Sequence, residues 1–180
     1  MLACDLFVVE TALLHTVFVL FFLDVRTRKV YLAGCTAHPT NAWMAQQARQ
    51  MAWHLQDGTL PLTVLVHDRD SRFTTAFDRV FASEWLRIVL TPPRCPWANG
   101  VAERWIRSAR AECLDHLLIL GEQHLYRVLS EYTKFYNERR PHQGLGQQCP
   151  VPLPRGPDQG PIRCRDVLGG ILHDYSRQVA

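Results

Sequence analysis

The chain has 180 residues, the length of one domain with or without a tail. A chain of this length can bury a full hydrophobic core without structural metals or disulfides. Its 47% hydrophobic and 21% charged residues are ordinary globular values, which exclude a disordered or collagen-like chain. The net charge of +3 permits a nucleic-acid partner without requiring one. The six cysteines form no CxxC pair and no apolar run is long enough to span a bilayer, so we expect free thiols and a soluble intracellular protein.

The first 36 residues are rich in Val, Phe, Leu and Thr, and charged positions divide them into three strands. These predicted strands are Leu2–Glu10, His15–Asp24 and Lys29–Cys35. Their short connections predict an antiparallel meander. The composition then becomes helical over Asn41–Gln56, and the short apolar run Leu62–His67 predicts a buried strand.

A second helix is predicted over Thr74–Trp85, because large apolar residues recur there at helical spacing. Those residues are Phe77, Val80, Phe81 and Trp85. A short strand is predicted at Arg87–Leu90, and prolines then exclude a helix until Asn99, which can cap a long helix over Val101–Leu118. The helical period is clearest in Glu122–Arg139.

This order of elements predicts an α/β fold with a mixed five-stranded sheet flanked by helices, the ribonuclease H-like architecture. We expect that domain to span residues 1–146. Five prolines between Pro150 and Pro161 indicate a linker over residues 147–161. Residues 162–180 are expected to form a short packed C-terminal tail.

Three carboxylates are candidates for a shared site. Asp5 interrupts an apolar strand, where an uncompensated charge is costly. Asp68 directly follows a buried strand, where α/β sheets place ligands, and Glu103 lies one turn inside a predicted helix. Each also has an ordinary interpretation, as a solvent-facing strand residue, a turn residue and a first-turn glutamate, and Asp70 competes with Asp68 for both of its roles.

In a ribonuclease H-like sheet the first and fourth strands are neighbours, and the long helix packs across their ends. Asp5, Asp68 and Glu103 would then converge on one point. Carboxylates that lie so close repel one another unless cations are bound between them. Oxygen ligands favour Mg²⁺ or Mn²⁺, and two such ions can stabilise the attacking and leaving oxygens of a phosphoryl transfer.

Four segments carry a more specific pattern. They are Asp5 in its strand and residues 67–73 (HDRDSRF), 96–104 (PWANGVAER) and 136–146 (YNERRPHQGLG). Together they resemble the integrase catalytic core of the DDE transposases and retroviral-type integrases, above all its bacterial insertion-sequence branch. The 34 residues between Asp68 and Glu103 are also the interval typical of that family.

The resemblance implies a polynucleotidyl transferase in which Asp5, Asp68 and Glu103 are catalytic and hold two Mg²⁺ or Mn²⁺ ions. Such an enzyme cuts a DNA strand and joins its freed 3′-hydroxyl to target DNA. The implied partners are DNA, as transposon ends and target, and further copies of the chain on that DNA, with no membrane. The implied location is the bacterial cytoplasm, with association with the nucleoid on DNA. DNA contacts are predicted at Asn99, Arg104, Arg107, Arg110 and Arg140.

Two features depart from the family pattern. Asp70 occupies a position that is usually glycine, and we expect a positive φ there, which Asp tolerates better than most residues. The chain begins within the first catalytic strand, so we expect the family's N-terminal helix-turn-helix region to be missing. The alternative function is therefore a truncated, non-catalytic remnant that binds DNA or oligomerises. A ribonuclease H-type nuclease, the third interpretation, would need a further acidic residue.

Overall fold

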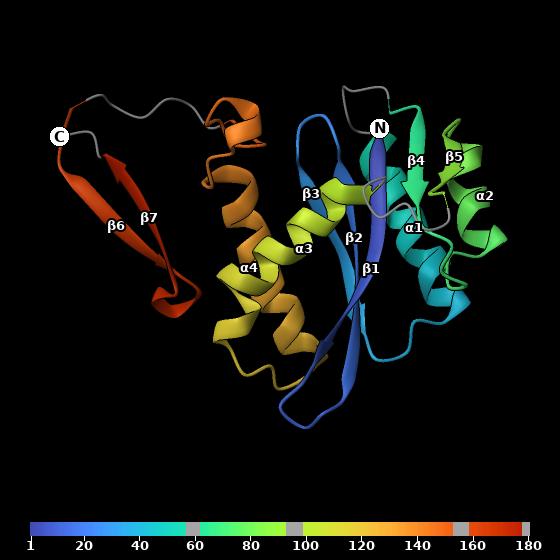
Figure 1. Ribbon diagram of the computed structural model, residues 1–180, viewed down its shortest axis with the longest axis horizontal. Coiled ribbons are helices and arrows are strands. Elements are labelled where there is room, and N and C mark those ends of the chain that lie inside the picture. The colour runs from blue at the N-terminus through green and yellow to red at the C-terminus, as the bar shows by residue number, and fades with distance from the viewer. Residues whose placement is uncertain (57–61, 93–98, 153–158, 178–180) are drawn as a thin grey trace.

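The computed structural model describes residues 1–56, 62–92, 99–152 and 159–177. Its centre is a five-stranded sheet in the order β3-β2-β1-β4-β5 (Figure 1). The predicted antiparallel meander is formed by β1 (Leu2–Glu10), β2 (Thr16–Asp24) and β3 (Val30–Thr36). The strands β4 (Val64–His67) and β5 (Arg87–Leu90) extend the sheet in parallel, with β4 paired to β1.

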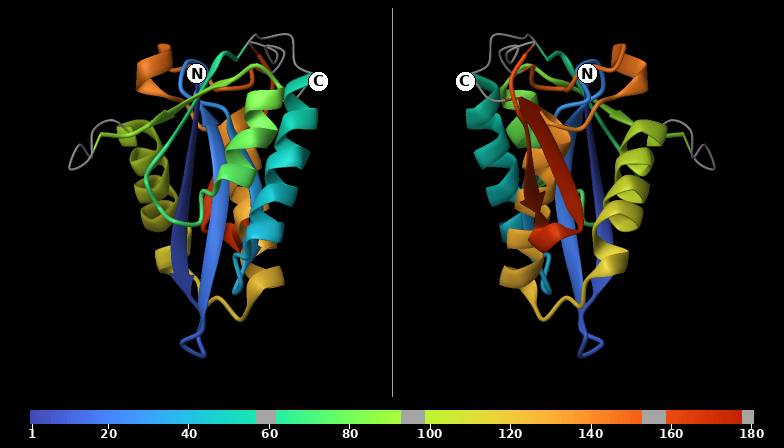
Figure 2. Two further views of the ribbon diagram at one scale, coloured as in Figure 1. Left: turned by 90° about the vertical axis from the view of Figure 1, so that its right-hand side faces the viewer. Right: turned by 90° about the vertical axis from the view of Figure 1, so that its left-hand side faces the viewer.

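Helices cover both faces of this sheet (Figures 1 and 2). One face packs against α1 (Asn41–Gln56) and α2 (Thr75–Ser83), and the other against α3 (Gly100–Glu112) and α4 (Glu122–Glu138). Successive strand residues point to opposite faces. In β2 this alternation buries Phe21 beneath α3 and Phe22 beneath α2, which explains why almost the whole strand is apolar. The mixed sheet and its flanking helices confirm the predicted fold class.

Trp85 corrects one expectation, because it was predicted on the buried face of the second helix. That helix ends at Ser83, and the side chain of Trp85 is 92% exposed. The amide of Trp85 donates to the carbonyl of Ala82 at 3.1 Å, and its φ of 63° turns the chain out of the helix. Leu86 is buried in the core instead. The spacing of apolar residues does not predict this turn, and the turn determines which apolar side chain is buried.

The third predicted helix is shorter than expected. It ends at Glu112, and a short 3₁₀ turn, Leu114–His116, takes the place of its last residues. Cys113 has φ −138° and ψ −66°, outside the helical region, which ends the helix there. Parts of two predicted segments, the proline-rich loop before α3 and the linker, lie outside the described residues.

The C-terminal residues form a hairpin of β6 (Ile162–Val167) and β7 (Leu172–Arg177), where the sequence predicts only a packed tail. The hairpin lies beside α4 (Figure 1). Val167 and Leu168 join the core on that side, and the amide of Leu168 donates to Glu131 on α4 at 2.8 Å. No helix in the described part of the chain is long and apolar enough to cross a membrane, and the five described cysteines are free thiols.

Asn137 fastens α4 to the edge strand β3. Its side-chain amide donates to the carbonyl of Val30 at 2.8 Å, and its carbonyl oxygen accepts from the amide of Val30 at 2.9 Å. We expect Asn137→Ala to lower the free energy of unfolding by about 2–4 kcal/mol, because two buried backbone groups lose their partners. Urea unfolding measures this cost. The matched control is Lys134→Ala, one turn earlier and exposed, and equal costs for the two variants would contradict the assignment.

Candidate active site

The pairing of β1 with β4 sets two aspartates level with each other. Ala3 is the partner of Val66 in this parallel pair, so Asp5 and Asp68 each lie two residues beyond the same rung. Side chains two residues apart share a face, and Ala3 belongs to the core beneath α3 and α4. The register therefore directs both carboxylates to the side of the sheet that carries α3.

The carboxylate of Asp5 is partly buried and is held by two hydrogen bonds. Its Oδ1 accepts from the amide of Leu6 at 2.8 Å, and its Oδ2 accepts from the Nδ2 of Asn99 at 3.1 Å. Asn99 precedes α3, as predicted, but its side chain makes no capping hydrogen bond. The buried Oδ1 of Asn99 has no partner among the described residues, so an unused oxygen ligand lies beside Asp5.

Negative charge accumulates around Asp5. Burial, above all, raises the pKa of Asp5 from 3.8 to about 7. The hydrogen bond from Leu6 opposes this rise, whereas the charges of Asp68, Glu103 and Asp70 add to it. The predicted carboxylates are therefore close enough to act on one another, and the structure contributes Asp70 as a fourth.

Hydrogen bonds distinguish Asp68 from its competitor Asp70. Asp70 is paired with Arg72, which approaches both of its oxygens at 2.9 Å. Asp68 accepts the amide of Asp70 on Oδ1 at 3.0 Å, and its other oxygen has no partner among the described residues. The prediction of a positive φ at Asp70 is wrong. The Asp68 side chain accepts the amide of Asp70 and so stabilises the turn without a residue in the left-handed conformation. Of the two, Asp68 is therefore the carboxylate that is less engaged by other described side chains.

His67 fixes the backbone at Asp68. Its buried ring contacts the carbonyl oxygen of Asp68 through Nδ1 at 2.7 Å and the carboxylate of Asp78 through Nε2 at 2.9 Å. Phe73 packs on the same ring with centroids 4.6 Å apart. Asp78, on α2, has no signal in the sequence beyond its place in a first helical turn, so its role emerges only from the fold.

Glu103 lies exposed on the first turn of α3. The ligand oxygens of Asp5, Asp68 and Glu103 do not all lie within 4.8 Å of one another, so the three carboxylates are coupled without forming a closed ligand set. Within the described ranges, one group of side chains does meet that distance, namely Cys164, Asp166 and His173 on the C-terminal hairpin. All three are exposed, and Asp166 and His173 form a cross-strand ion pair at 3.0 Å.

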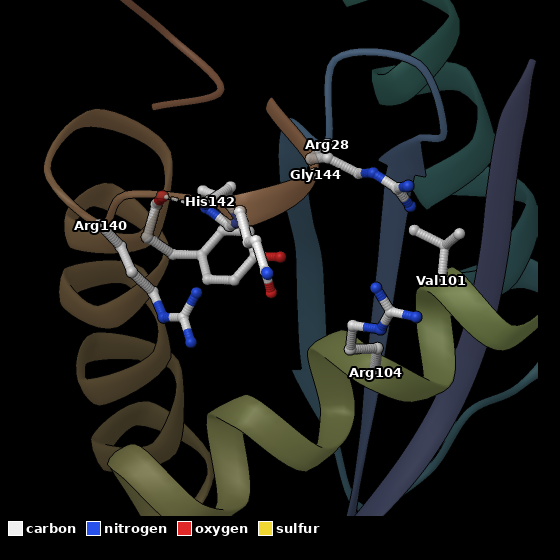
Figure 3. A pocket seen from close by; sticks show the side chains of 8 residues that line it. Arg28, Val101, Arg104, Arg140, His142 and Gly144 are labelled. Atoms are coloured by element: carbon white, nitrogen blue, oxygen red, sulfur yellow. Dashed lines mark hydrogen bonds between the residues drawn. The ribbon is translucent and has the colours of Figure 1, made fainter. Parts of the chain in front are cut away.

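The four arginines among the predicted DNA contacts lie in different environments. Arg107 is exposed on α3, while Arg110 donates to the carbonyl of Val8 at 2.7 Å. Arg140 forms an ion pair with Glu112 at 2.6 Å. Arg104 lines a cavity of about 360 Å³ beside the start of α3 (Figure 3).

The comparisons with known proteins agree with this fold. Residues 85–150 match the family described as the integrase core domain. The fold is similar to the HTLV-2 integrase catalytic core in complex with magnesium (13% identity, TM-score 0.60, 81% of this chain and 90% of that one). It is also similar to the BIV integrase catalytic core (16% identity, TM-score 0.56, 82% of this chain and 90% of that one).

A third similar structure is the simian T-cell lymphotropic virus intasome in complex with PP2A regulatory subunit B56 gamma (12% identity, TM-score 0.64), which covers 97% of this chain and 65% of that one. No curated protein gives a significant match. The fold defines a ribonuclease H-like α/β protein. Within that class, the family match and the solved structures confirm the predicted resemblance to the integrase catalytic core.

The raised pKa of Asp5 predicts how stability depends on pH in the metal-free protein. Between pH 3.8 and about 7 the folded chain keeps a proton that the unfolded chain releases, so ionisation favours unfolding as the pH rises. Over this pH range we expect the free energy of unfolding of the wild type to fall by up to about 4 kcal/mol relative to that of Asp5→Asn. Urea unfolding with a chelator present measures the difference. Glu10→Gln, at the exposed end of the same strand, is the control. A constant difference between the wild type and Asp5→Asn would contradict the prediction.

Proposed function

We propose that this chain is the catalytic core of a transposase or integrase that cuts and joins DNA strands with the help of divalent cations. The observation that carries the proposal is the paired placement of Asp5 and Asp68 by β1 and β4, with Glu103 acting on the same buried carboxylate. The match of residues 85–150 to the integrase core domain supports the same reaction class.

The donor set fits Mg²⁺ or Mn²⁺. Asp5, Asp68 and Glu103 offer carboxylate oxygens, and Asn99 adds a buried amide oxygen without a partner in the described part of the chain. A cation here would favour the ionised form of Asp5, which burial and the charges of Asp68, Glu103 and Asp70 disfavour. The similar HTLV-2 core is a complex with magnesium. When bound, two such ions supply positive charge to the attacking and leaving oxygens of the phosphate.

The chain's own residues prepare this chemistry. Asn99 orients the Asp5 carboxylate, and His67 holds the backbone from which Asp68 projects. The three carboxylates would together hold the ions, and Asp5 would do so in its ionised form. The exposed face of α3 presents Arg107 beyond Glu103, where it meets DNA phosphates without reading sequence.

The partners follow from the proposed reaction. The substrate is DNA, as transposon ends and target, and the trimeric and dimeric forms of the similar HTLV-2 core support an assembly of several copies of the chain on that DNA. We place the catalytic domain at residues 1–146, followed by a linker over 147–161 and a tail over 162–180. The proposed location is the bacterial cytoplasm, with association with the nucleoid on DNA.

The alternative, a non-catalytic remnant that binds DNA or oligomerises, has one observation in its favour. The oxygens of Asp5, Asp68 and Glu103 do not all lie within 4.8 Å of one another, so they do not surround a single ion as they stand. Catalysis and DNA binding must therefore be measured separately to decide between the two functions.

Variants of Glu103 make that separation. We expect Glu103→Gln and Glu103→Asp each to lose at least about a hundredfold in cleavage and joining, because two-ion geometry does not tolerate a lost or withdrawn oxygen. The assay uses oligonucleotide duplexes that carry the cognate DNA ends, with Mg²⁺ or Mn²⁺, and filter binding follows DNA affinity in parallel. Affinity should survive in both variants, because the phosphate contacts lie elsewhere on α3.

The matched control is Asp115→Asn, an exposed carboxylate beyond the end of α3, which should keep full activity. Near-full joining by Glu103→Gln would remove Glu103 from the catalytic set. A wild-type chain that binds these duplexes but never cleaves them would support the remnant.

A further inference from the structure

A cavity of about 360 Å³ opens between the β2–β3 turn, the start of α3 and the segment after α4 (Figure 3). Three arginines from distant parts of the sequence line it, namely Arg28, Arg104 and Arg140. Tyr136 and His142 contribute to the same wall. Its volume lies within the range of small-ligand sites, roughly 300–1,000 Å³.

The positive charge of this cavity is only partly compensated. Arg140 is bound to Glu112 through three hydrogen bonds of 2.6 to 3.1 Å, so its charge is neutralised. The guanidinium groups of Arg28 and Arg104 have no carboxylate or hydrogen-bond partner in the parts of the chain that the structure describes, and both reach into the space beside Val101 (Figure 3). Two like charges without a counter-charge favour an anion between them.

His142 contributes no further charge at neutral pH. Its Nε2 donates to the backbone carbonyl of Tyr136 at 3.2 Å. Burial lowers the pKa of His142, and the charges of Arg140 and Arg28 lower it further. The ring of His142 is therefore a neutral part of the cavity lining. The preference for an anion comes from Arg28 and Arg104.

The turn that carries Arg28 is built with backbone strain. Arg28 has a φ of 64°, a conformation that glycine or asparagine adopts more readily. The turn is fastened by the amide of Arg28 donating to the carbonyl of Asp24 at 2.7 Å, and by Thr27 donating to the Asp24 carboxylate at 2.9 Å. The hydrogen bonds of the turn hold Arg28 in this strained conformation. Because a smaller residue would suit the turn better, the arginine side chain is a candidate for a function.

We propose that this cavity binds one phosphate group of a DNA backbone, with Arg28 and Arg104 as the donors. Arginine meets phosphate through paired hydrogen bonds, which suits two guanidinium groups that face one opening. The choice of DNA as the source rests on the proposed function, because Arg104 follows Glu103 on α3 and a strand that reaches the carboxylates passes this end of the helix. Arg140 lines the same cavity, but its guanidinium group is engaged by Glu112, so it is not counted among the donors.

The first test uses inorganic phosphate as the probe, in thermal unfolding of the full chain at constant ionic strength. Phosphate should raise the melting temperature of the wild type in a saturable way, because it binds the folded chain alone. Arg28→Gln and Arg104→Gln should each lose this rise. Arg26→Gln, an exposed arginine in the same turn, removes the same charge and should keep it. An equal rise in Arg28→Gln and Arg26→Gln would overturn the site.

The second test distinguishes DNA from free phosphate by following the binding of a short duplex over a range of salt concentrations. Arg28→Gln should reduce the slope of log affinity against log salt by about one, the loss expected for one phosphate contact, and Arg26→Gln should not. A phosphate effect that Arg28→Gln abolishes, combined with an unchanged salt slope, would overturn the DNA assignment in favour of a free phosphate ligand. Neither test needs catalysis, so a failure of Glu103 in strand cleavage leaves both results interpretable.

Discussion

The parallel pairing of β1 with β4 is the constraint on which the site depends. It brings together two strands that are some sixty residues apart in sequence and sets Asp5 level with Asp68 on the face that α3 covers. A carboxylate in this position is costly because it is buried and because the neighbouring charges are of the same sign. The fold tolerates this loss of stability, and cation binding is the simplest way to reduce it.

Opposite charges lie close together at this end of the sheet. The carboxylates that raise the pKa of Asp5 lie where β1, β4 and α3 meet, while two arginines without a partner among the described residues, one from the β2–β3 turn and one from α3, line a cavity at the start of α3. The segment after α4 closes that cavity, and its Arg140 is held by Glu112. A phosphodiester needs both environments, because its reacting phosphate requires cations and its neighbouring phosphates require guanidinium groups.

Much of the fold and the two aspartates can be predicted from local sequence. Apolar strands and helically spaced apolar residues can be recognised from a short stretch of sequence. Asp5 is conspicuous because it places a charge within such a strand. Turn geometry is harder to foresee, since the left-handed conformation of Trp85 moves a large apolar residue to the surface. The hairpin β6–β7 is likewise hidden, because exposed residues fill most of both strands.

Side-chain partners that are distant in sequence account for what the sequence does not reveal at the site. Asn99 has the chemistry of a helix cap, but the fold offers its amide a buried carboxylate instead. Arg28 is an ordinary turn residue until the fold sets it across a cavity from Arg104. Composition and spacing contain no information on such pairs, since each partner is chosen by the packing of separate elements.

Binding of Mn²⁺, followed by the loss of its free-ion electron paramagnetic resonance signal, tests the central claim most directly. The account predicts that Asp68→Asn weakens Mn²⁺ binding by at least about tenfold, because it removes a ligand, while Asp70→Asn changes it little, because Asp70 is engaged by Arg72. Weakened binding in Asp70→Asn combined with wild-type affinity in Asp68→Asn would contradict the assignment of the site.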